Sequence, residues 1–199
     1  MEFESFYAKE WVQVSTAFVF VVIVLLTPVM YWGVSRNLKG NTKEKFIEAA
    51  FDIYGVVFFL LVAPAGYLGL YFLGSQSKFM LNDPMAWVCF LGGAASVYDL
   101  IRVRLALGSA KVSAGCTARI ESILMFEKLA KLAFCLSLIP LIYGGVMIGV
   151  TNLIDPSSIS NMLWFLTFMM TGLAVVYSVA SKTLLLVSQA YASNPELGC

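Results

Sequence analysis

The sequence predicts an all-α integral membrane protein, a bundle of five transmembrane helices that forms a single membrane domain over residues 1–199. The chain is 60% hydrophobic and only 13% charged, with a mean hydropathy of +0.84. A soluble domain cannot bury so much apolar surface. Apolar runs of about 20 residues instead cross a hydrocarbon core about 30 Å thick, because a helix satisfies its own backbone polar groups there.

Five segments are apolar and long enough to be spans. No cleaved signal peptide is expected ahead of the first, because residues 1–10 are acidic and lack a basic region and a cleavage pattern. Asp83-Pro84 and Asp155-Pro156 are helix-start signals before the third and fifth spans, since aspartate caps free N–H groups and proline suits the first helical position. The predicted spans are 11–35, 53–74, 84–103, 132–150 and 162–181.

The third span, 84–103, is the shortest apolar run, since the uncharged stretch from Met85 to Tyr98 has only 14 residues before Asp99. The positive-inside rule tests whether it crosses. If it does, 11 of the 13 basic residues lie on one side and Lys9 and Lys78 on the other. If it does not, the best division is nine against four. We therefore predict five spans with the N-terminus outside and the C-terminus inside, and inner loops at 36–46 and 105–117.

The second, fourth and fifth helices are predicted to extend beyond the membrane on the inner side. Asn41 and Glu44 form a capping-box pattern that starts the second helix. The fourth should begin near Thr117 and the fifth continue past Lys182 toward Tyr191. These cytoplasmic extensions are amphipathic, so their apolar faces need a partner. The second and third spans also resemble the fourth and fifth, as two hairpins in the same orientation. This resemblance fits either an internal duplication or chance in a biased composition.

Asp99, Arg102 and Arg104 are the charges closest to the hydrocarbon. Asp99 and Arg102 are three residues apart and can pair on one helix face, which lowers the cost of burying either. One interpretation is an ion or proton path. The other, which we favour, places all three at the inner interface, with the arginines extending to lipid headgroups.

Small residues at four-residue spacing predict close helix packing, because they let backbones approach where no hydrophobic effect drives association. Pro28, Pro64 and Pro140 interrupt three spans, which fits either packing or a broken-helix binding site. Two cysteines within spans, Cys89 and Cys135, are expected to be small buried side chains. The predicted packing residues are Ala65, Gly69, Gly92, Gly93, Gly145, Gly149, Ala174 and Ser178.

A basic inner face is predicted to contact anionic lipid or an acidic partner. We expect membrane lipids and other membrane subunits as partners, in a hetero- or homo-oligomer, and no nucleic acid. The residues of this face are Lys39, Lys43, Lys45, Arg119, Lys128 and Lys131.

Catalytic signatures are missing from the sequence. It has no histidine, which removes imidazole bases and most haem, zinc, copper and iron sites. It also lacks a phosphate-binding glycine loop, a nucleophile elbow and an acidic magnesium cluster. We therefore expect no catalytic, cofactor or metal site and no enzyme activity.

The function that fits these features is a non-catalytic subunit or scaffold that packs into a larger membrane complex, in a bacterial inner membrane. The alternative is a small transporter or channel that uses Asp99, Arg102 and the proline-broken helices. In that case Asp99 should line a hydrated cavity.

Overall fold

The computed structural model describes residues 51–52, 55–60, 62, 66, 73, 82–112, 115–153 and 160–193. These residues are helical or lie in short turns, and none of them forms a strand. Three long helices dominate the described part, namely α4 (Asn82–Val112), α5 (Thr117–Thr151) and α6 (Asn161–Ser193). All three are long and apolar enough to cross a membrane, which supports an integral membrane protein. The predicted first span, most of the second and the inner loop 36–46 lie outside the described residues.

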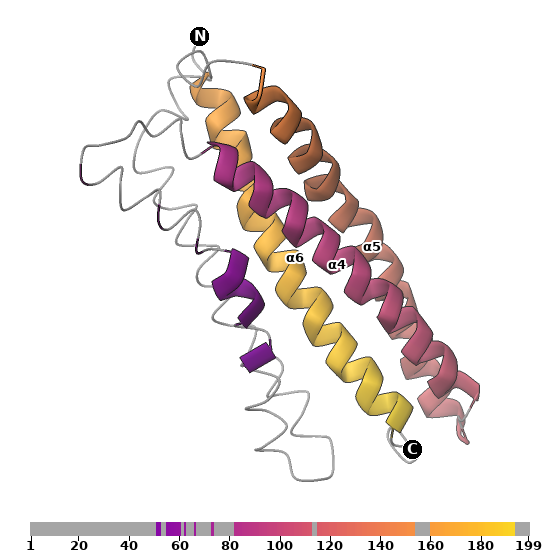
Figure 1. Ribbon diagram of the computed structural model, residues 1–199. Coiled ribbons are helices and arrows are strands. Elements are labelled where there is room, and N and C mark those ends of the chain that lie inside the picture. The colour runs from indigo at the N-terminus through magenta and orange to yellow at the C-terminus, as the bar shows by residue number, and fades with distance from the viewer. Residues whose placement is uncertain are drawn as a thin grey trace.

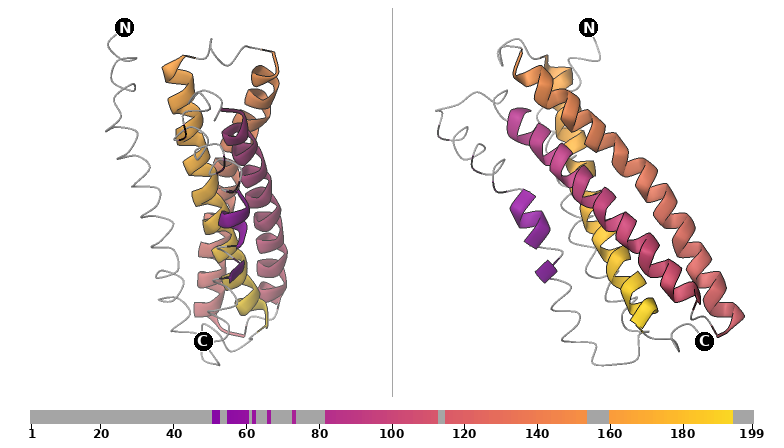
Figure 2. Two further views of the ribbon diagram at one scale, coloured as in Figure 1. Left: turned by 60° about the vertical axis from the view of Figure 1, so that its left-hand side comes forward. Right: turned by 45° about the vertical axis from the view of Figure 1, so that its right-hand side comes forward.

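The three helices lie side by side, with α5 antiparallel to α4 and α6 (Figures 1 and 2). Helix α4 packs extensively on both neighbours, whereas α5 and α6 contact each other far less. The Thr151 hydroxyl donates to a carboxylate oxygen of Asp83 at 3.3 Å, so the end of α5 lies level with the start of α4. We call this the Asp83 end of the bundle and the opposite one the Arg119 end.

Each helix begins or ends at a local signal in the sequence. Asp83 and Pro84 lie in the first turn of α4, where an acidic residue and a missing N–H are both favourable. Ser160 caps the N-terminus of α6, because its hydroxyl accepts the N–H of Leu163 at 3.2 Å. The sequence pointed to Asp155 and Pro156 for this start, but those residues are not described and Ser160 is the cap of the observed helix.

Two helices continue where the sequence suggested an interruption. Helix α4 extends to Val112, so much of the expected loop 105–117 is helical. Its Leu107 and Ala110 are buried against the other helices, which favours the helix over a loop. Helix α5 begins at Thr117 and runs unbroken through Pro140. The expectation of a proline-broken helix is therefore not met at Pro140.

The buried apolar residues of the bundle form two main clusters. The larger lies toward the Arg119 end and joins all three helices, with Val103, Ile123 and Leu185 among its members. The smaller joins Val88 and Val175 to Val57 and Leu60, which belong to a short helical stretch at residues 55–60 that lies beside α6 (Figure 1). The parts of α5 and α6 at the Arg119 end thus bury apolar residues against one another and against α4.

Candidate functional site: a polar seam between α4 and α6

Hydroxyl and thiol groups line the contact between α4 and α6. On α6 they lie three, four or seven residues apart, which places them on one helix face. All are buried, and the facing polar residues of α4 are equally enclosed. We call this set the polar seam, and it consists of Cys89, Ser96 and Asp99 on α4 and Thr167, Thr171, Ser178 and Ser181 on α6.

The half of the seam near the Asp83 end is centred on Thr171. Its hydroxyl oxygen lies 2.7 Å from the Thr167 carbonyl oxygen, 3.3 Å from the Met85 carbonyl oxygen and 3.4 Å from the sulfur of Cys89. The hydroxyl of Tyr143 on α5 lies 2.7 Å from that of Thr167. All three helices are therefore connected by hydrogen bonds within what the sequence predicts to be hydrocarbon, where polar groups require protein partners.

The second half of the seam is centred on Ser178. Its hydroxyl lies 3.0 Å from the Gly92 carbonyl oxygen on α4 and 2.9 Å from the Ala174 carbonyl oxygen on its own helix. The hydroxyl of Ser96 donates to the same Gly92 carbonyl at 2.9 Å. These hydroxyls are satisfied by backbone carbonyls, so the arrangement holds two helices together and offers no activated nucleophile.

The seam is interrupted between its two halves. Thr171 and Ser178 are about 10 Å apart along α6 at the usual helical rise, and Ala174, which is fully buried, lies between them against Gly92. A Cβ atom added at Gly92 would lie 3.2 Å from the Ala174 Cβ atom. Because this packing leaves no room for a bridging group, the seam does not form a continuous chain of hydroxyls.

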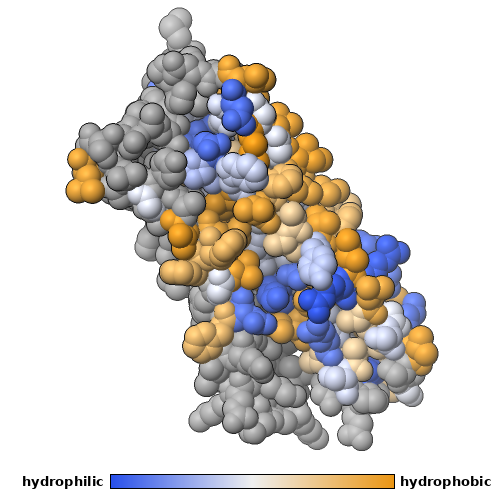
Figure 3. All heavy atoms as spheres, in the orientation of Figure 1, coloured by the Kyte–Doolittle hydropathy of each residue, from blue (hydrophilic) through white to orange (hydrophobic). Residues whose placement is uncertain are grey.

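Asp99 is buried where the seam approaches the Arg119 end, with 8% of its surface exposed. Lys182 on α6, Arg102 on α4 and Asp52 are the charged groups that act electrostatically on its carboxylate. On the face drawn in Figure 3, a patch of hydrophilic side chains lies between apolar regions. The two cations thus offset only part of the cost of burying the Asp99 charge.

Arg102 and Arg104 point away from Asp99. Both are exposed, and the guanidinium carbon of Arg102 lies 5.8 Å from the ring centre of Tyr98. The described residues contain no ion pair between Asp99 and Arg102; the one that they do contain joins Glu127 and Lys131 at 3.0 Å. The expected pairing on one face is therefore not formed, because Asp99 faces α6 and Arg102 the outer surface.

The glycines explain the close approach of the helices. Gly93 meets the backbone of Leu141, where an added Cβ atom would lie 2.7 Å from the Leu141 Cα atom. Gly144 meets Ala86 and Phe90 of α4, and its added Cβ atom would lie 2.8 Å from the Ala86 carbonyl oxygen. Such distances require glycine, because a real Cβ atom would displace the facing backbone.

The predicted packing residues divide into three groups. Gly92, Ala174 and Ser178 lie against one another between α4 and α6, and Gly93 lies between α4 and α5. Gly145 only touches the Phe90 ring and Gly149 has nothing within 4 Å, so the contact on α5 is made by Gly144 instead. Ala65 and Gly69 lie outside the described residues.

Several other side chains differ from the sequence-based expectation or lie outside the described residues. Arg119, expected on the basic face, is fully buried and donates to the Tyr191 carbonyl oxygen at 2.6 Å. Cys89 is buried as predicted, whereas Cys135 is exposed. Lys128 and Lys131 are exposed on α5, and Lys39, Lys43 and Lys45 are not described. The hydroxyls of Thr167 and Thr171 were missed, although their four-residue spacing in an apolar helix was a usable signal.

The described side chains of the polar seam provide packing contacts and hydrogen bonds between the helices. Within the described ranges, no group of three or more Cys, Asp or Glu side chains could hold a metal ion. Comparison of the chain with protein-family models, with curated proteins and with solved structures finds no match.

Proposed function

We propose that the protein is a non-enzymatic membrane subunit that packs into a larger membrane complex through the outward face of α5. The observation that carries this proposal is the unequal burial of the three helices. Only 22% of the most apolar window of α5 is buried, against 56% for α4 and 39% for α6. Of the three described helices, α5 is thus the most apolar and the least covered by its own chain.

The outward face of α5 is suited to another transmembrane helix. Its large apolar side chains lie three, four or seven residues apart, which places them in one stripe along the helix. Gly149, with nothing within 4 Å, lies at the Asp83 end of this stripe and allows a second backbone to approach. The exposed apolar residues of the face are Met125, Leu132, Ile139, Ile142 and Val146.

The ends of α5 and α6 near Arg119 are covered by their own chain. The extensions of α5 and α6 were expected to need an external partner for their apolar faces. Ile123 and Leu185 of these extensions are buried within the chain itself. The support for a partner therefore comes from the spanning part of α5 and not from the extensions.

Extraction in a mild detergent, followed by sizing and mass spectrometry of the co-migrating chains, tests the proposal. We expect a stoichiometric set of other membrane proteins, and we expect Gly149→Leu to release them. Gly108→Leu is the matched control, since Gly108 on α4 also has nothing within 4 Å. A protein that runs alone, or only with copies of itself, would contradict a role as a subunit of a larger complex.

A small transporter or channel is the second candidate, and the buried Asp99 beside Lys182 is the observation that favours it. The break in the polar seam at Ala174 argues against a path between α4 and α6. Asp99→Asn separates the two functions. A subunit should assemble normally with this change, because the amide keeps the shape of the carboxylate. A transporter should assemble but lose ion or substrate flux in reconstituted vesicles.

A further inference from the structure

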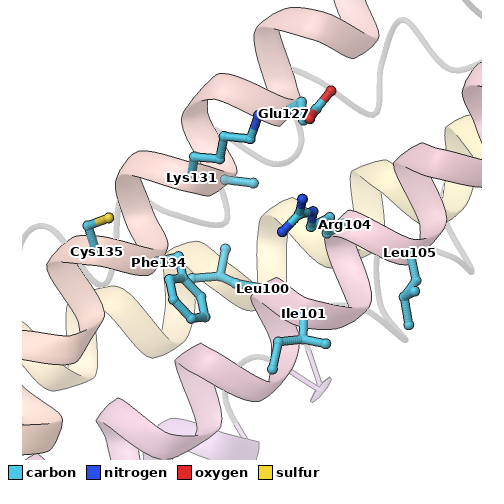
Figure 4. Close-up of a pocket in the computed structure, with 9 residues that line it drawn as sticks. Leu100, Ile101, Arg104, Leu105, Glu127, Lys131, Phe134 and Cys135 are labelled. Carbon is cyan, nitrogen blue, oxygen red and sulfur yellow. Dashed lines mark ion pairs between the residues drawn. The ribbon is translucent and has the colours of Figure 1, made fainter.

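A groove of about 470 Å³ opens between α4 and α5 on the side away from α6. Leu100 and Phe134 face each other across it, with Ile101 and Leu105 along the α4 side (Figure 4). The charged residues Arg104, Glu127 and Lys131 lie together toward one end. The groove thus has an apolar length and a charged end, which matches the two parts of a lipid molecule.

The charged end of the groove lies at the expected depth of a membrane surface. Arg104 follows Asp83, and Lys131 precedes Thr151, by about 20 residues of helix, which is about 30 Å. Because Asp83 and Thr151 lie level with each other, both cations are about one hydrocarbon thickness from the Asp83 end. Lys182 lies at a similar distance from the start of α6 at Asn161. Leu100 and Phe134 then lie within the hydrocarbon.

The charged end carries a net positive charge. Glu127 is the acidic residue of the groove, and it pairs with Lys131 at 3.0 Å. Arg104 and Lys111 also act electrostatically on the Glu127 carboxylate, so three cations surround one anion. Arg104 extends into the space between the two helices (Figure 4). Its planar guanidinium presents several N–H donors in the geometry that suits a phosphate group.

The size of the groove favours a lipid over a protein helix. Its volume is in the range of small-ligand pockets, about 300–1,000 Å³. A helix, about 10 Å across with its side chains, would rest on the more exposed stripe of α5 instead. Cys135, which lines the groove, is exposed, so the groove opens onto the outer surface of the helices.

From these features we infer that the groove between α4 and α5 is a binding site for one phospholipid with an anionic head group. Arg104 and Lys131 bind the phosphate, and an acyl chain lies along Leu100, Ile101 and Phe134. Glu127 holds the Lys131 ammonium group at the entrance. This site is separate from the outward stripe proposed for subunit contacts, so either can fail without the other.

Native mass spectrometry of the purified full chain, with phosphatidylglycerol and phosphatidylcholine supplied in equal amounts, tests the site. The unchanged protein should retain one phosphatidylglycerol in preference to phosphatidylcholine. The double variant Arg104→Gln/Lys131→Gln should bind it about 25-fold more weakly, because each basic residue near anionic lipid contributes about a fivefold preference. Ile101→Trp, which fills the apolar part of the groove, should reduce the binding of both lipids.

The matched control is Arg102→Gln/Lys128→Gln, which removes the same two residue types from the same two helices outside the groove. It should leave retention of phosphatidylglycerol within about twofold of the unchanged protein. Thermal unfolding in detergent establishes that each variant is folded before its binding is compared. Equal losses in both double variants would overturn the proposal in favour of diffuse surface charge. Displacement of the lipid by millimolar inorganic phosphate would overturn it in favour of a simple anion site.

Discussion

Single polar side chains in this bundle are satisfied mainly by backbone carbonyl groups. Ser178 and Ser96 share the Gly92 carbonyl oxygen, and the buried Arg119 donates to the carbonyl of Tyr191. Asp99 differs, because the charges of Lys182 and Arg102 offset part of the cost of its burial. Interhelical hydrogen bonds of the Ser178 type contribute only about 0.6 kcal/mol each in membrane proteins. Arg119 combines a charge, full burial and a helix-to-helix bond, so it should matter far more.

Arg119→Ala should lower the free energy of unfolding by about 3 kcal/mol, because it leaves a cavity and an unsatisfied Tyr191 carbonyl. Titration of folded protein from mild detergent into a denaturing detergent measures this energy. Lys128→Ala, an exposed change on the same helix, should stay within about 0.5 kcal/mol. Equal stability of the two variants would show that Arg119 does not hold the ends of α5 and α6 together.

At the scale of the helices, α4 is the central element because it contributes glycines to both of its neighbours. Gly92 lets α6 approach, and Gly93 lets α5 approach. Adjacent glycines point about 100° apart on a helix, so two helices can pack closely at one level. At its contact with α4, helix α5 contributes Gly144, whereas α6 contributes Ala174. The remaining face of α5 is left for lipid or for another protein.

Gly144→Ala and Gly149→Ala should have opposite effects on stability. The first places a Cβ atom 2.8 Å from the Ala86 carbonyl oxygen, and the resulting overpacking should cost about 1–3 kcal/mol. The second meets open space, and it should stabilise the helix by as much as about 1 kcal/mol, because alanine is the better helix former. Thermal unfolding of the two variants in the same detergent measures both effects. A destabilising Gly149→Ala in the isolated chain would show that this position is already packed.

At the scale of the whole molecule, the distribution of basic residues fits one orientation of the bundle. Arg104, Lys131 and Lys182 lie at similar depth on the three helices, about 30 Å from the Asp83 end. The segments beyond them contain the further basic residues Lys111, Arg119 and Lys128. The positive-inside rule then predicts that the Arg119 end lies in the cytoplasm.

Cysteine labelling tests this orientation. In a background without native cysteines, Leu153→Cys should react with a membrane-impermeant maleimide in intact cells, since Leu153 is 87% exposed at the Asp83 end. Lys128→Cys, also exposed, should react only after the membrane is permeabilised. The reverse pattern would invert the bundle and move the proposed lipid site to the outer surface.

The helical class of the chain, its apolar character and the start of α5 at Thr117 were determined by the sequence itself, because they depend on composition and on local signals. Helix propensity and hydropathy act over a few residues and can be read without knowing the neighbours. The pairing of Gly92 with Ala174 and Ser178 joins two residue sets that the sequence had singled out separately.

The tertiary structure alone decided which way each side chain faces. In the fold, Asp99 faces α6 and Arg102 faces away from it. Gly144 rather than Gly149 makes the close contact with α4, and Arg119 is buried. The tertiary structure also extended α4 to Val112, because Leu107 and Ala110 pack against the other helices. The periodicity of a nearly uniform apolar helix does not distinguish its lipid-facing side from its packed side. That distinction arises only when the helices meet, because contact between neighbours rather than exclusion from water sets the orientation of a helix in a membrane.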